Sequence, residues 1–96
     1  MLILVTYDVN LTSEGGTRRL RKVARECLNY GRRVQNSVFE CVITEAQLVR
    51  LKSSICKLID PDTDNILIYI LGKNWQRNVI RIGQSSTYDI DDTLIV

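Results

Sequence analysis

The chain has 96 residues, of which 45% are hydrophobic and 25% are charged, with one proline and five glycines. This size and balance predict one globular domain and exclude a disordered or repetitive chain. Histidine is absent, which excludes a histidine general base and Ser–His or Cys–His nucleophiles. The apolar start, residues 1–9, is too short to span a bilayer and lacks a basic leader, so we expect a cytoplasmic protein with no membrane contact.

The first strand is predicted over residues 1–9, a run of apolar and β-branched side chains that stops at Asp8. Asp8 is the first charged residue of the chain, and a carboxylate at the end of a buried strand is a candidate metal ligand and catalytic group. Because Mg²⁺ uses one or two carboxylates, a symmetric dimer is needed to supply two copies of Asp8. The alternative is that Asp8 only caps the following loop. Tyr7 is expected in the core, and a hydroxyl close to the metal is its alternative role.

The net charge is only +2, but the basic residues are unevenly placed. Between Thr17 and Arg33 seven cations face a single acid, Glu26, whereas other acids gather at residues 60–64 and 89–92. The seven are Arg18, Arg19, Arg21, Lys22, Arg25, Arg32 and Arg33. An ordinary solvated face is one interpretation. The hypothesis favoured here is a surface that neutralises phosphates along a duplex backbone without reading bases.

Residues 10–17, which contain the glycine pair Gly15–Gly16, are predicted to form a loop, and a helix is predicted to follow up to Tyr30, with Gly31 ending it in a left-handed conformation. Residues 32–43 predict two strands with a turn or bend at Asn36–Ser37. Thr44 and Gln47 then form a capping box for a second helix that reaches about Ile59. The three cysteines lie inside these patterned segments and are predicted to be small core residues. They are Cys27, Cys41 and Cys56.

Further strands are predicted at residues 65–71 and 78–82, which completes a βαββαβ order with one added strand. This order predicts an α+β, ferredoxin-like sandwich with two helices on one face of an antiparallel sheet. The strands are apolar on both sides, so we expect the second face to be buried against another copy, in a homodimer. Residues 1–83 are predicted to form the domain, and residues 84–96 a tail that contacts the dimer mate. No role is assigned to Trp75.

Several segments of the chain resemble the CRISPR-associated Cas-two family. They are the strand end Tyr7-Asp8-Val9, the basic stretch 18–24, the block 30–41 (YGRRVQNSVFEC), Leu58–Pro61, Ile68–Gly72 and Ile82–Gly83. The similarity covers residues 1–83, and the glycine pair is similar to a subset of the family that serves type I-C systems.

The resemblance implies a ferredoxin-like homodimer that joins the Cas-one integrase to capture foreign DNA as new spacers. It also implies a metal-dependent endonuclease acting on double-stranded DNA or RNA, with Asp8 of each copy binding Mg²⁺ (or Mn²⁺) across the dimer axis. The alternative is a purely structural nucleic-acid-binding adaptor. An RNA-recognition domain of the same topology would need an aromatic pair, and the third strand offers Phe39 alone.

Overall fold

The computed structural model describes residues 1–72 and 79–83, which form two helices and five strands. The helices are α1 (Gly16–Leu28) and α2 (Glu45–Leu58). The strands are β1 (Leu2–Asp8), β2 (Gly31–Gln35), β3 (Val38–Val42), β4 (Asn65–Ile70) and β5 (Val79–Gly83). Trp75 and the predicted tail, residues 84–96, lie outside the described residues.

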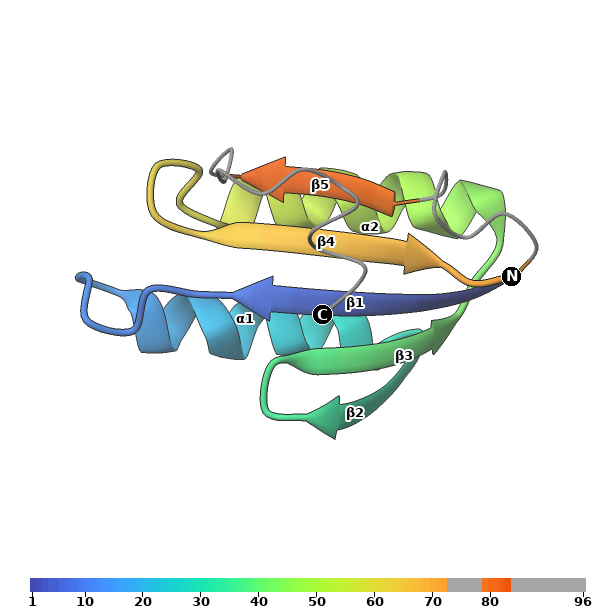
Figure 1. Ribbon diagram of the computed structural model, residues 1–96, viewed down its shortest axis with the longest axis horizontal. Coiled ribbons are helices and arrows are strands. Elements are labelled where there is room, and N and C mark those ends of the chain that lie inside the picture. Colours follow the sequence, from blue (N-terminus) through green and yellow to red (C-terminus); the bar gives the residue numbers. More distant parts are fainter. Residues whose placement is uncertain (73–78, 84–96) are drawn as a thin grey trace.

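The five strands form one antiparallel sheet in the order β2-β3-β1-β4-β5, and both helices cover the same face (Figure 1). The predicted α+β, ferredoxin-like sandwich with an added strand is therefore confirmed. Figure 1 also shows that the β1–α1 loop and the α2–β4 loop lie at the same end of the sheet, where β1 finishes. These two loops are far apart in the chain, and they come together because β1 and β4 are neighbouring strands in the sheet.

Strand β1 shows why the two faces of the sheet differ. Its odd-numbered side chains, Ile3, Val5 and Tyr7, are buried beneath the helices, because successive side chains of a strand point to opposite faces. The even-numbered side chains and their cross-strand partners form the other face, called here the open face. Its members are Leu2, Leu4, Thr6 and Asp8 of β1, Val38, Glu40 and Val42 of β3, and Asn65, Leu67 and Tyr69 of β4.

The helices form where the sequence pattern predicted them. In α1 one stripe of side chains is buried, comprising Leu20, Val23, Ala24 and Cys27. The predicted capping box of α2 is confirmed: Thr44 Oγ1 accepts from the Gln47 amide at 3.1 Å, and Gln47 Oε1 accepts from the Thr44 amide at 2.9 Å. Within the described residues, no helix is long and apolar enough to cross a bilayer.

Three details differ from the sequence prediction. Gly31 does not end α1 in a left-handed conformation; the helix stops at Leu28, and Gly31 is the first residue of β2. A Cβ on Gly31 would overlap the Glu40 carbonyl oxygen, so glycine is required there by close strand contact. Cys27 and Cys41 are buried as predicted, whereas Cys56 is exposed on α2.

Candidate functional site

Asp8 is the last residue of β1, and its side chain is exposed on the open face. The alternation of β1 places it there, because Tyr7 before it points into the core. Solvent access is what a carboxylate needs if it is to meet a hydrated cation and a phosphate. Among residues 1–72 and 79–83 of one chain, no cluster of three or more carboxylate, thiol or imidazole groups is placed to hold a metal.

Asn65 is the cross-strand partner of Asp8 in the β1–β4 pairing, so both side chains project from the open face. Its Oδ1 is buried and has no hydrogen-bond partner among the described residues. A buried polar oxygen without a partner is costly, and carboxylate and carboxamide oxygens are hard ligands. Asp8 and Asn65 are therefore the oxygen-bearing side chains at this strand end that an Mg²⁺ or Mn²⁺ ion would use.

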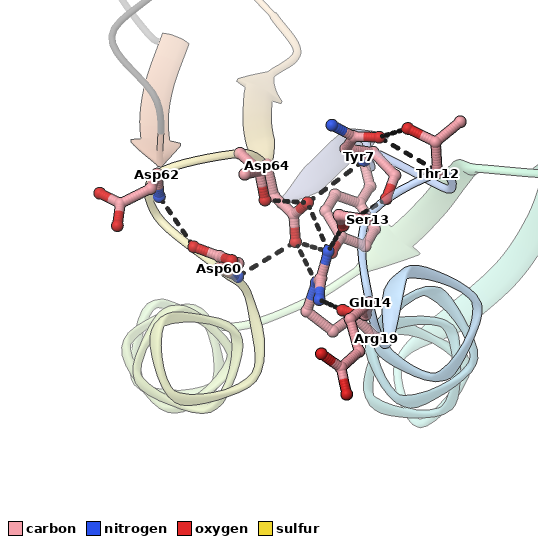
Figure 2. A network of polar contacts seen from close by, with 10 residues as sticks. Tyr7, Thr12, Ser13, Glu14, Arg19, Asp60, Asp62 and Asp64 are labelled. Atoms are coloured by element: carbon pink, nitrogen blue, oxygen red, sulfur yellow. Dashed lines mark hydrogen bonds and ion pairs between the residues drawn. The ribbon is translucent and has the colours of Figure 1, made fainter.

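The Tyr7 side chain is 2% exposed, which confirms its predicted core position. Its hydroxyl points away from the open face and donates to Asp64 Oδ2 at 2.5 Å. Asp64 is itself fully buried, directly before β4, and Figure 2 shows it at the centre of a polar network. The structure thus places the Tyr7 hydroxyl beside Asp64, and not beside Asp8.

Burial alone would raise the pKa of Asp64. Hydrogen bonds from Arg19, from Tyr7 and from the backbone amides of Asp60 and Asn10 outweigh this, and lower the pKa to about 2. Burial and the hydrogen bond to Asp64 together raise the pKa of Tyr7 well above its ordinary value. The Asp64 carboxylate is therefore ionised, and the Tyr7 phenol protonated, throughout the neutral range.

The seven predicted phosphate-binding residues do not form one surface. Three of them, Arg21, Arg25 and Arg33, line a groove of about 480 Å³ between α1 and β2. The floor of this groove includes Leu20 and Ala24. Because β2 runs beside α1, residues from two separate segments contribute positive charge to one hollow, which suits an anionic partner.

The other four predicted residues lie outside the lining of this groove; they are Arg18, Arg19, Lys22 and Arg32. Arg18 and Lys22 are exposed on α1 outside the groove lining. Arg32 pairs with Glu40 across the strands of the open face, with 3.4 Å between Nε and Oε1. Arg19 is directed inward, where its Nε donates to Asp64 Oδ2 at 2.7 Å.

Arg33 is held in the groove by an aromatic contact. Its guanidinium carbon lies 5.3 Å from the centre of the Phe39 ring, a cation–π arrangement, and Phe39 is fully buried. The two residues are cross-strand partners between β2 and β3. This pairing keeps the Arg33 charge at the groove while its neighbour Arg32 points to the other face.

Sequence reasoning missed Asp64 and Asn65. The pattern of the sequence places Asp64 in an exposed acidic turn and Asn65 at the start of a strand, without a role for either. A signal was present, since an acid directly before an apolar strand can be drawn into the core when a cation pairs with it. The identity of that cation, Arg19, required the tertiary structure.

Comparison with known proteins adds the family context. The family model described as "CRISPR associated protein Cas2" matches residues 1–79. The chain is 53% identical to the "CRISPR-associated endonuclease Cas2" of Halalkalibacterium halodurans, over 99% of both chains. It is 49% identical to the "CRISPR-associated endoribonuclease Cas2" of Chlorobaculum tepidum, over the full length of both. The crystal structure of Streptococcus pyogenes Cas2 superposes with a TM-score of 0.72 at 54% identity, covering 86% of this chain and 100% of that one.

Proposed function

The chain belongs to the CRISPR-associated Cas2 family, and we propose that it is a metal-dependent endonuclease that acts as a homodimer on double-stranded DNA or RNA. Relatives named endonuclease and endoribonuclease support phosphodiester cleavage. The observation that carries the proposal is the position of Asp8: an exposed carboxylate at a strand end, opposite an Asn65 oxygen that has no partner among the described residues.

The open face supports a homodimer. Leu2 and Val42 are 38% and 71% exposed, and Leu4, Leu67 and Tyr69 on the same face are only partly covered. Apolar surface of this kind is stabilised by contact with a second copy. Because Asp8 lies at the end of this face, a two-fold axis through the face would bring a second Asp8 into the assembly.

Asp8 and Asn65 would hold a Mg²⁺ or Mn²⁺ ion through their oxygen atoms. When bound, this ion would polarise the scissile phosphate and lower the pKa of a water nucleophile. The chain itself contributes the position of the two oxygen ligands and the positive charge that retains the substrate. Since the chain has no histidine, proton transfer by an imidazole does not take part.

A second function is a nucleic-acid-binding adaptor for the Cas-one integrase in spacer acquisition, without physiological cleavage. One observation favours it: the groove of Arg21, Arg25 and Arg33 lies on the helix side of β2, whereas Asp8 is on the open face. Duplex binding through this groove does not require the substrate to reach Asp8 of the same chain. The two functions therefore predict different effects of an Asp8 substitution.

The test is Asp8→Ala, with Asp62→Ala as a matched control in an exposed turn. We expect Asp8→Ala to abolish Mg²⁺-dependent cleavage of duplex DNA and RNA while dimerisation and duplex affinity remain unchanged, and Asp62→Ala to cleave like wild type. Cleavage that survives in Asp8→Ala, or in EDTA, would contradict the metal site. Spacer integration with the Cas-one integrase then separates the functions, since an adaptor keeps its activity in Asp8→Ala.

A further inference from the structure

A single buried carboxylate joins four separate parts of the chain near the end of β1. Asp64 has no exposed side-chain surface, and its two oxygens accept hydrogen bonds from each part. The donors include the Tyr7 hydroxyl at 2.5 Å, the Asn10 amide at 3.2 Å, Arg19 Nε at 2.7 Å and the Asp60 amide at 3.1 Å. Figure 2 shows Tyr7 of β1, Arg19 of α1 and Asp60 of the α2–β4 turn converging on Asp64. Asn10 reaches it from the loop after β1.

Two of these contacts flank Asp8 along the chain. Tyr7 precedes Asp8 in the chain, and Asn10 follows two residues later, so Asp64 contacts the side chain of the residue before Asp8 and a backbone amide after it. Asp64 also directly precedes Asn65 in the chain, and Asn65 is the cross-strand partner of Asp8. One buried group thus contacts or adjoins both strand ends from which the candidate ligands project.

Arg19 extends this control to the β1–α1 loop. Besides pairing with Asp64, its guanidinium donates to the Glu14 carbonyl oxygen and the Ser13 hydroxyl, at 2.7 and 2.6 Å. The Arg19 side chain is 14% exposed, so most of its surface is withdrawn from solvent. A cation that is engaged in this way is poorly placed to neutralise phosphates, unlike its neighbours on α1.

The contribution of the Asp64–Arg19 ion pair to the stability of the fold does not account for its presence at this place. Burying two charges is expensive, and an apolar pair of similar volume is often as stable. Ligand positions at metal sites, however, depend on the groups that hold the ligands from behind. The pair lies directly behind the strand ends that carry Asp8 and Asn65.

We propose that Asp64 and Arg19 are positioning residues for the metal site, which fix Asp8 and Asn65 opposite each other. The inference rests on the proposed function, because it presupposes that Asp8 binds a divalent cation. It assigns Arg19 a role different from that of the other six basic residues. It also assigns a role to an acid that the chain order alone places in a surface turn.

The test measures Mn²⁺ binding to the purified protein by electron paramagnetic resonance, below the melting temperature of each variant. The variants are Asp64→Asn and Arg19→Ala, with Asp62→Asn and Arg50→Ala as matched controls at exposed positions. We expect both network variants to bind Mn²⁺ about tenfold more weakly, and both controls to bind like wild type. Duplex affinity of Asp64→Asn in EDTA should be unchanged.

The possible outcomes separate the two proposals. Folded network variants that bind Mn²⁺ like wild type would overturn the positioning role and leave the proposed function intact. If Asp8→Ala binds Mn²⁺ as well as wild type does, the metal site itself fails, and this inference falls with it.

A milder variant covers the case in which Asp64→Asn does not fold. Tyr7→Phe keeps the ring in the core and removes one hydrogen bond to Asp64. We expect it to bind Mn²⁺ about threefold more weakly, and unchanged binding by this folded variant would equally overturn the positioning role.

Discussion

Arg19 and Asp64 form a buried ion pair, with 2.7 Å between Nε and Oδ2, although 45 residues separate them in the chain. The pair ties α1 to the start of β4, on the helix side of the sheet. Since Asp64 has no exposed surface, its charge is stabilised almost entirely by hydrogen bonds within the protein. The stability of this fold is therefore linked to the ionisation of a single carboxyl group.

Acid should weaken the fold through Asp64. Its pKa is about 2 in the folded protein against an ordinary value of 3.8, so the ionised form stabilises the fold at pH values above about 4. This contribution, on the order of 2 kcal/mol, is lost as the pH falls from about 4 to about 2.

Urea unfolding at several pH values checks this expectation. The free energy of unfolding of wild type should fall more steeply over that range than the value for Asp64→Asn, which has no carboxyl at this position. Asp62→Asn, at an exposed position in the same turn, should follow wild type. Parallel curves for wild type and Asp64→Asn would contradict the assignment of a low pKa to Asp64.

The groove between α1 and β2 should contribute to duplex binding by neutralising phosphates. Replacing both Arg21 and Arg25 with alanine is expected to weaken duplex affinity. The slope of log K against log salt should also become shallower, by about 0.9 for each phosphate that is no longer neutralised. Binding titrations at several salt concentrations measure both quantities.

Arg50 on α2 provides the control for this experiment. It is exposed and lies outside the groove lining, so Arg50→Ala should keep the wild-type slope. A wild-type slope in the Arg21/Arg25 double variant would show that phosphates bind elsewhere.

Gly31→Ala should destabilise the domain by disturbing the pairing of β2 with β3. The new methyl group would overlap the Glu40 carbonyl oxygen, and the backbone must shift to admit it. We expect a loss of about 2 kcal/mol in the free energy of unfolding.

Chemical denaturation of Gly31→Ala and of Gln35→Ala tests this prediction. Gln35 is exposed on the same strand, and its replacement should change stability by less than about 0.5 kcal/mol. Equal stability of the two variants would rule out a steric requirement for glycine at this position.

The helices and strands could be predicted from the sequence, because the signals for them are local. The apolar run before Asp8, the stripe of Leu20, Val23 and Ala24, and the Thr44–Gln47 capping box each depend on neighbours a few residues apart. These patterns specified an α+β sandwich and placed Asp8 at a strand end. They also located the basic segment, although not the directions of its side chains.

Which side chains meet depends on the tertiary fold. Asp64 is drawn from an acidic turn into the interior because Arg19 and Tyr7 reach it from distant segments. For the same reason the basic residues divide, with Arg33 joining the α1 groove while Arg32 turns to the open face. Consecutive residues of a strand, such as Arg32 and Arg33, point to opposite faces of the sheet. Which neighbouring element each side chain then contacts depends on the order of the strands and helices in the fold.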